Sequence, residues 1–154
     1  MTVLDAHAVI AFLTDEPARQ QVEEILRADG VAVGIGAANL AECIDVLVRL
    51  KRVPGDQAGD ALRLVLQRVD VLPADEAIGR LAGALRARHY ERDRQPLSLA
   101  DCLALATAKV LERPLATADR PLLDVAVAER VTVIPLPDQW AVEPQPSDAG
   151  DSDG

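Results

Sequence analysis

Apolar residues occur along the chain in two alternating patterns. Short β-branched and aliphatic runs, bounded by turn residues, are typical of buried parallel strands. Longer segments with apolar residues at three- and four-residue spacing are typical of amphipathic helices. The pattern predicts strands at 2–4, 31–36, 69–72, 114–117 and 131–134. It predicts helices at 6–13, 17–28, 37–50, 57–68, 74–89, 99–111 and 120–128.

Strands that alternate with helices in this way imply right-handed crossovers and a mostly parallel sheet covered by helices on both faces. The expected fold class is therefore α/β. The 154 residues suit one domain, which we place at 1–142, and the Pro-, Ser- and Asp-containing segment 143–154 is expected to be a disordered acidic tail. Aromatic residues make up only 2% of the chain, so Leu, Val, Ile and Ala must build the core.

The formal net charge of −9 is unusual for a protein that binds nucleic acid. Four of the acids lie in the tail and four more are candidate ligands discussed below, so the rest of the chain is nearly neutral. Cys43 and Cys102 lie far apart without metal-site spacing and are interpreted as small core residues. No signal peptide or membrane-spanning run is evident, and a cytoplasmic protein without a membrane partner is expected.

Four acids stand at the ends of predicted strands or near the starts of helices. They are Asp5, Glu42, Asp101 and Asp119. Each has an ordinary alternative explanation: Asp5 and Asp119 suit helix N-caps, Asp101 completes a capping box with Ser98, and Glu42 suits a solvated helix face.

Taken together, the four acids favour a binding site. The carboxyl ends of parallel strands meet at one crevice, where several like charges are costly unless a cation compensates them. Carboxylates without His or Cys partners suit Mg²⁺ or Mn²⁺. Such ions commonly activate water for attack on phosphodiesters, so the sequence points to metal-dependent phosphodiester hydrolysis.

Four segments resemble the signature blocks of the PIN-domain ribonucleases, and Glu16-Pro17 with the short chain length resembles the VapC-type toxins of bacterial toxin–antitoxin pairs. The segments cover most of the ordered chain and occur in the order of the family. They are Val3-Leu4-Asp5, Asn39-Leu40-Ala41-Glu42, residues 97–108 (LSLADCLALATA) and Leu115-Ala116-Thr117-Ala118-Asp119.

The resemblance implies a three-layer α/β/α sandwich and a Mg²⁺-dependent endoribonuclease that cuts RNA with metal-activated water. It makes the four acids the metal site, with Asp5 and Asp101 as principal ligands and Glu42 and Asp119 completing the set. It also implies a toxin that forms a homodimer and binds a small antitoxin.

An apolar antitoxin helix would need a groove on this protein. We expect the groove among exposed apolar residues around Phe12, Val22 and Leu47.

The family often places a small hydroxyl residue soon after the first acid, whereas Ala6-His7 follows Asp5 here. His7 is interpreted as a partly buried structural residue, with a phosphate contact as the alternative. Thr117 either supports a carboxylate through its hydroxyl or is a plain strand residue. The basic stretch 86–94 either grips RNA, with Tyr90 stacking on a base, or is a solvated helix end.

Three other functions compete with the toxin. A housekeeping RNA-processing nuclease would use the same chemistry, and the sequence does not separate it from a toxin. A non-catalytic PIN-like module that binds RNA or protein would have lost the acids, which are intact here. A small-molecule phosphohydrolase would need a nucleophilic aspartate motif or a glycine-rich phosphate loop, and neither follows the first strand.

Overall fold

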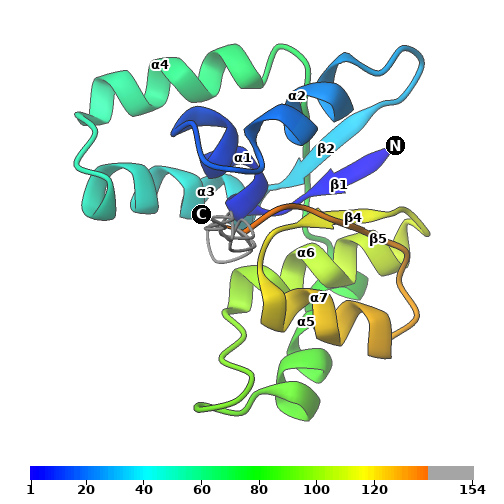
Figure 1. Ribbon diagram of the computed structural model, residues 1–154. Coiled ribbons are helices and arrows are strands. Elements are labelled where there is room, and N and C mark those ends of the chain that lie inside the picture. Colours follow the sequence, from blue (N-terminus) through cyan, green and yellow to red (C-terminus); the bar gives the residue numbers. More distant parts are fainter. Residues whose placement is uncertain (139–154) are drawn as a thin grey trace, which may run out of the picture.

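Five short strands form one parallel sheet in the order β3-β2-β1-β4-β5. The computed structural model describes residues 1–138 (Figure 1), so the predicted tail at 143–154 lies outside the described residues. The strands are β1 Thr2–Leu4, β2 Val33–Gly36, β3 Asp70–Leu72, β4 Leu115–Thr117 and β5 Val133–Pro135. The helices are α1 Ala6–Leu13, α2 Arg19–Arg27, α3 Ala37–Asp45, the π-helical η1 Val46–Leu50, α4 Gly55–Val65, α5 Glu76–His89, α6 Leu99–Val110 and α7 Arg120–Ala128.

The sheet separates two hydrophobic clusters, which makes the predicted α/β/α sandwich. Successive strand residues point to opposite faces. Leu4 accordingly packs with side chains of α1 to α4, while its neighbour Val3 packs with side chains of α5 to α7. Figure 1 shows α1, α2 and α4 on one side of the sheet and α5, α6 and α7 on the other.

The strand order creates a switch point beside the first strand. The chain runs from β1 outward to β2 and β3, then crosses to the other side of β1 and continues through β4 and β5. Chain segments that follow β1 and β4 therefore diverge at their carboxyl ends, and crevices at such points are where open α/β sheets bind ligands.

The helix predicted at 37–50 changes its hydrogen bonding partway. It is α-helical to Asp45, and η1 then continues with a bond from the Lys51 amide to the Val46 carbonyl at 3.0 Å. Its buried residues are Asn39, Cys43 and Leu47, whereas Ile44 is 46% exposed.

The prediction that Phe12, Val22 and Leu47 lie at an exposed apolar surface for the antitoxin is wrong. Val22 and Leu47 are buried in the core, and Phe12 is half-buried against it. The periodicity of α2 places Val22 towards the sheet, so it cannot offer a surface. Cys43 and Cys102 are buried, as predicted for core residues, and burial raises the pKa values of their thiols to about 12 and about 11.

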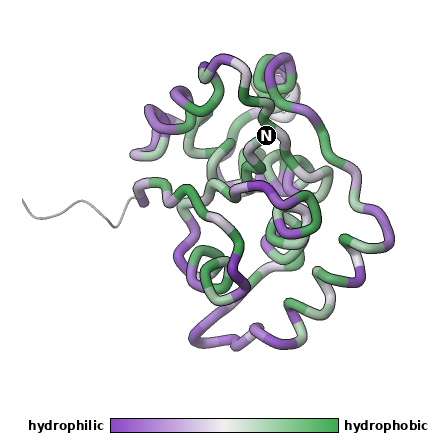
Figure 2. Tube along the Cα trace, turned by 90° about the vertical axis from the view of Figure 1, so that its right-hand side faces the viewer, coloured by the Kyte–Doolittle hydropathy of each residue, from purple (hydrophilic) through white to green (hydrophobic). Residues whose placement is uncertain are grey.

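Polar segments lie at the periphery of the fold. Figure 2 shows the loop after α5 as a hydrophilic stretch at one end of the molecule. None of the helices within residues 1–138 is long and apolar enough to cross a membrane.

Candidate active site

Asp5 directly follows β1 and caps α1. Its Oδ1 accepts a hydrogen bond from the Ala8 amide at 2.7 Å, and its Oδ2 accepts one from the Thr117 hydroxyl at 2.5 Å. The residue is only 1% exposed. Burial raises the pKa of Asp5 to about 7, because both hydrogen bonds offset only part of the desolvation and the charge of Asp101 adds to it.

Thr117 connects two of the acids at the end of β4. Its hydroxyl donates to Asp5 and accepts the amide hydrogen of Asp119, with a nitrogen–oxygen distance of 2.9 Å. Asp119 in turn caps α7 by accepting from the Leu122 amide at 2.7 Å. Burial raises the pKa of Asp119, and the charge of Asp101 contributes in the same direction. These contacts agree with the first alternative for Thr117, in which its hydroxyl supports a carboxylate.

Asp101 sits in the first turn of α6, in the predicted capping box. The Ser98 amide donates to Asp101 Oδ2 at 2.7 Å, and the Asp101 amide donates to Ser98 Oγ at 3.0 Å. Buried Asn39 joins α3 to this turn, because its Nδ2 donates to the Ala100 carbonyl at 3.2 Å. This bond places Asn39 beside the turn that carries Asp101.

Glu42 projects from α3 and is half-buried. Its Oε2 is buried without a hydrogen-bond partner among residues 1–138. Burial raises the pKa of Glu42, and the charges of Asp101 and Asp119 raise it further. An unpartnered carboxylate oxygen near other acids is costly, and a bound cation or a donor from a ligand would compensate it.

The four acids form one electrostatically coupled group with Asp101 at its centre. The charge of Asp101 raises the pKa values of Asp5, Glu42 and Asp119, in each case alongside the effect of burial. Within residues 1–138, however, no three His, Cys, Asp or Glu side chains are close enough together to enclose an ion. Asp5, Asp101 and Asp119 each accept a hydrogen bond from a backbone amide, and this bond holds each carboxylate at the start of its own helix.

His7 is exposed, so its interpretation as a partly buried structural residue is wrong. The first turn of α1 directs it away from the sheet and into a cavity of about 520 Å³ that Glu42 and Asp119 also line. A charge on His7 opposes the larger effect of burial on the pKa values of both acids. His7 therefore belongs to the surroundings of the site.

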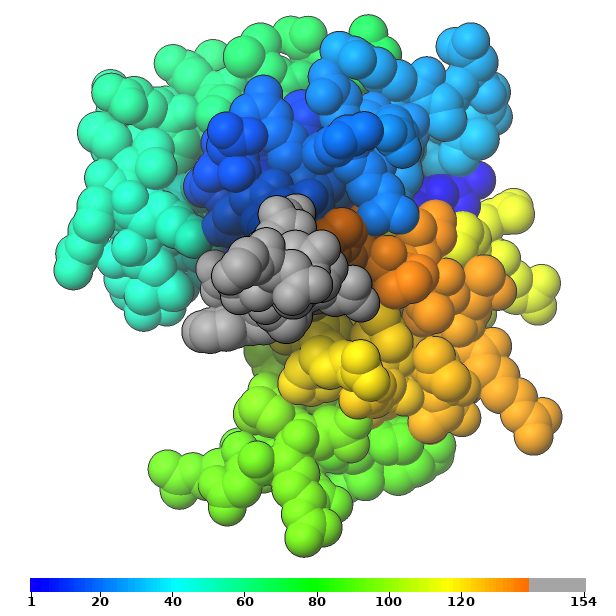
Figure 3. Space-filling view, in the orientation of Figure 1, coloured from blue at the N-terminus to red at the C-terminus, as the bar shows by residue number. Residues whose placement is uncertain are grey.

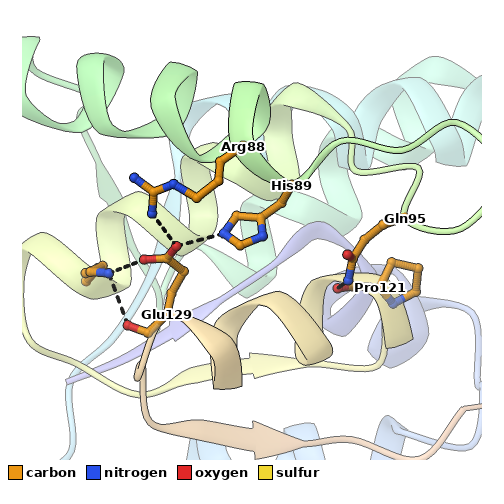
Figure 4. A network of polar contacts seen from close by, with 6 residues as sticks. Arg88, His89, Gln95, Pro121 and Glu129 are labelled. Carbon is orange, nitrogen blue, oxygen red and sulfur yellow. Dashed lines mark hydrogen bonds and ion pairs between the residues drawn. The ribbon is translucent and has the colours of Figure 1, made fainter.

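Much of the basic stretch 86–94 is used inside the protein. Arg88 and His89 each lie 2.7 Å from Glu129 Oε1, and Lys109 contacts the other oxygen of the same carboxylate (Figure 4). Arg86 donates to the Leu97 carbonyl at 3.3 Å. The stretch thus fastens α5 to α6 and α7, which weighs against its prediction as an RNA grip.

Comparisons with known proteins identify the family of this chain. Residues 2–128 match the family model of the PIN domain. A ribonuclease VapC of Mycolicibacterium smegmatis is 35% identical over 116 residues, which cover 73% of this chain and 87% of that protein. Ribonuclease VapC30 of Mycobacterium tuberculosis is 31% identical over 117 residues, which cover 73% of this chain and 86% of that protein.

Two solved structures show the same fold. One is VapBC2 from Rickettsia felis bound to a DNA fragment from its promoter, with a TM-score of 0.69, 16% identity, and coverage of 88% of this chain and 98% of that one. The other is VapC20 of Mycobacterium tuberculosis, a toxin that cleaves the sarcin–ricin loop, with a TM-score of 0.65, 17% identity, and coverage of 83% and 95%. This chain therefore belongs to the PIN domain family, and VapC ribonucleases are among its relatives.

Proposed function

We propose that this protein is an endoribonuclease that hydrolyses RNA phosphodiester bonds at Asp5, Glu42, Asp101 and Asp119. The observation that carries the proposal is the electrostatic coupling of these four acids at the switch point of the sheet. Burial and the charge of Asp101 raise the pKa values of Asp5, Glu42 and Asp119 despite the opposing effect of His7, and an added cation would compensate this cost, which suits a metal-assisted reaction at phosphorus. The relatives named as ribonucleases support the same activity.

The donor chemistry of the site fits Mg²⁺ or Mn²⁺. All four candidate ligands are carboxylates, and Glu42 offers a buried oxygen without a partner among the described residues. Mg²⁺ usually keeps several waters and takes only one or two carboxylates, so a closed cluster of acids is not required. When bound, the ion would act as a Lewis acid toward the phosphate and the attacking water.

The residues of the chain have separable tasks in this proposal. Asp5 and Asp101 are the principal ligands, because the cap of α1 and the capping box of α6 fix both carboxylates. Thr117 positions Asp5 and the Asp119 backbone relative to each other. Glu42 and Asp119 complete the set and orient water on the side of the cavity that they line.

We further propose that the protein is the toxin of a toxin–antitoxin pair, forms a homodimer and is inhibited by a small cognate antitoxin. Relatives named VapC and solved VapBC complexes of the same fold support this assignment. A co-purifying small protein encoded by an adjacent reading frame, whose removal releases ribonuclease activity, is the expected finding. Full activity in the presence of every such partner would favour a role in RNA processing.

The nuclease assignment is tested by RNA cleavage with protein freed of its partner. Asp5→Asn, Asp101→Asn and the addition of a chelator should each lower the rate by at least about 100-fold, since a lost interaction of several kcal/mol corresponds to that factor. The matched control is Asp75→Asn, because Asp75 caps α5 through a 2.9 Å bond from Ile78 but lies outside the site. Equal rates in the site variants or in chelator would refute the assignment.

Metal binding can be measured without activity. Mg²⁺ at about ten times its dissociation constant should stabilise the wild type by about 1.4 kcal/mol. The gain should largely disappear in Asp101→Asn and remain in Asp75→Asn. Thermal unfolding with and without Mg²⁺ measures both.

A further inference from the structure

The cavity beside the carboxylates is lined by other polar residues as well as by the acids. Glu42 and Asp119 line it, and so do Glu16 and Lys51. It lies between α1, the α1–α2 turn, η1 and the start of α7. Figure 3 shows the blue segments of α1 and α2 in the upper part of one face and the yellow and orange segments of α7 in its lower part. An RNA strand whose phosphate sits at the acids would therefore place a neighbouring nucleotide in this cavity.

The size and the walls of the cavity suit a nucleobase. Its volume of about 520 Å³ falls within the range of about 300–1,000 Å³ that is typical of small-ligand sites. Ile10 from α1 and Val46 and Leu50 from η1 provide apolar surface against which a flat ring can pack. The π-helical turn matters here, since Leu50 and Lys51 reach the cavity from the end of η1, and such turns are frequent at functional sites.

Glu16 and Lys51 form a fixed polar edge in this wall. Lys51 Nζ lies 2.6 Å from Glu16 Oε1, and Thr14 Oγ1 lies 2.9 Å from the same oxygen. Although burial raises the pKa of Glu16, the bonds from Lys51 and Thr14 outweigh it and hold that pKa below its ordinary value. Glu16 is therefore a charged acceptor with an ammonium donor directly beside it.

The order of donors and acceptors on this edge selects among the four bases. Lys51 and Thr14 both bond to Glu16 Oε1, so the carboxylate offers its other oxygen, Oε2, as the acceptor for a base, and the neighbouring ammonium offers a donor. Guanine presents the matching series on its Watson–Crick edge, with O6 as an acceptor followed by the N1 and N2 donors. Adenine, cytosine and uracil each lack two adjacent donors. Single-stranded RNA is commonly recognised through hydrogen bonds to this edge.

We propose that the cavity is a guanine subsite, in which Glu16 Oε2 accepts from N1 and N2 and Lys51 donates to O6 of the guanine next to the scissile bond. This inference rests on the proposed ribonuclease function and adds a sequence preference to it. Glu16 and Lys51 act here as specificity residues, and the four acids perform the hydrolysis.

The test uses the full-length protein and RNA oligonucleotides with randomised positions around the cut. Guanine should be preferred at one position flanking the cut by about 10- to 100-fold, the discrimination expected from one paired charged contact. Replacing that guanine with inosine, which lacks only the N2 amino group, should lower kcat/KM by about 5- to 20-fold. The same order of preference should appear in dissociation constants measured with the non-cleaving Asp5→Asn protein.

Substitutions at Glu16 and Lys51 test whether these two residues cause the preference for guanine. Glu16→Gln should make guanine and inosine nearly equivalent, because the amide has only one acceptor oxygen. Lys51→Met should reduce discrimination against adenine. Glu24→Gln is the matched control, since Glu24 is exposed on α2 and lies outside the cavity. Circular dichroism confirms that each variant is folded.

The outcomes separate this inference from the function on which it rests. Cleavage by the wild type with equal rates for guanine, inosine and adenine at every flanking position would overturn the guanine subsite and leave the nuclease intact. Loss of antitoxin binding in Glu16→Gln together with unchanged base preference would assign the cavity to the protein partner and would also overturn it. An absence of all RNA cleavage and binding would refute the ribonuclease proposal and the subsite with it.

Discussion

Replacing Asp5 with Asn should abolish activity and yet stabilise the metal-free protein. The wild-type carboxylate is 1% exposed, and burial raises its pKa from 3.8 to about 7. At about 1.4 kcal/mol per pKa unit, this shift corresponds to roughly 4 kcal/mol of lost stability at pH 8, where the group is ionised. Asparagine keeps the shape and the bond from the Ala8 amide but carries no charge.

Asp5→Asn avoids the free-energy cost of burying the Asp5 charge but weakens the contact with Thr117. The asparagine side chain can donate to the Thr117 oxygen, which leaves the Thr117 hydroxyl hydrogen without its acceptor at a cost of about 1 kcal/mol. The expected net gain is therefore about 3 kcal/mol at pH 8. The folded wild type binds its proton more tightly than the unfolded chain, so its stability falls as the pH rises from about 4 to about 7. The gain should accordingly be near zero at pH 4 and complete above pH 7.

Urea unfolding in chelator at pH 4, 5, 6, 7 and 8 measures this difference directly. Groups away from the four acids that titrate in the same range affect the wild type and the variant alike, so the difference between the two curves reports Asp5 and its coupling to the other three acids. Asp75→Asn supplies the baseline for an aspartate-to-asparagine change at an exposed helix cap. If Asp5→Asn were less stable than the wild type at pH 8, or if the difference were the same at pH 5 and pH 8, the assigned cost of burying this charge would be refuted.

Two further substitutions test contacts around the site and away from it. Thr117→Val should cost about 1–3 kcal/mol of stability and move the acidic limb of the kcat/KM profile to higher pH, because the Thr117 hydroxyl lowers the pKa of Asp5 and its removal raises that pKa. Urea unfolding and pH–rate profiles measure the two effects, with Thr132→Val at an exposed position as the control. An acidic limb that does not move would contradict this prediction. Glu129→Gln should cost about 1–3 kcal/mol at pH 7, because hydrogen bonds from Lys109, His89 and Arg88 and the charge of Lys109 lower the pKa of Glu129 to about 2. That stability is complete above about pH 4.5 and is lost as the pH falls towards 2, so the cost should shrink in urea unfolding at pH 2.5, and an equal cost at both pH values would contradict it.

The fold was largely predictable from the sequence because its signals are local and repeated. Every predicted strand and helix occurs, with boundary shifts of a few residues, such as β5 beginning at Val133 rather than Val131. Helix starts were predicted best where the sequence places a residue that can cap a helix, as at Ser98 and Asp119. The π turn of η1 was not predictable, because nothing in residues 46–50 distinguishes it from a continued α-helix.

Exposure was the property that the sequence predicted least well. His7 and Val22 were both assigned to the wrong environment, since an apolar pattern gives the spacing of a face but not the direction in which the whole helix is rotated. The internal use of Arg88 was likewise invisible, because its partner Glu129 lies 41 residues further along the chain. Pairings over such distances depend on how α5 and α7 pack, which local patterns do not encode.

Helix capping and metal binding are compatible roles for the acids of the site. The sequence presents helix capping and metal binding as alternatives for Asp5, Asp101 and Asp119, but each carboxylate has about four lone-pair sites and a cap uses only one. Each cap fixes a carboxylate at the positive end of a helix dipole, which reduces the cost of gathering several anions. Capping is therefore compatible with the proposed role of these acids as metal ligands. Asparagine preserves the cap and removes the charge, whereas alanine removes both, so the two substitutions at one position separate the structural role from the chemical one.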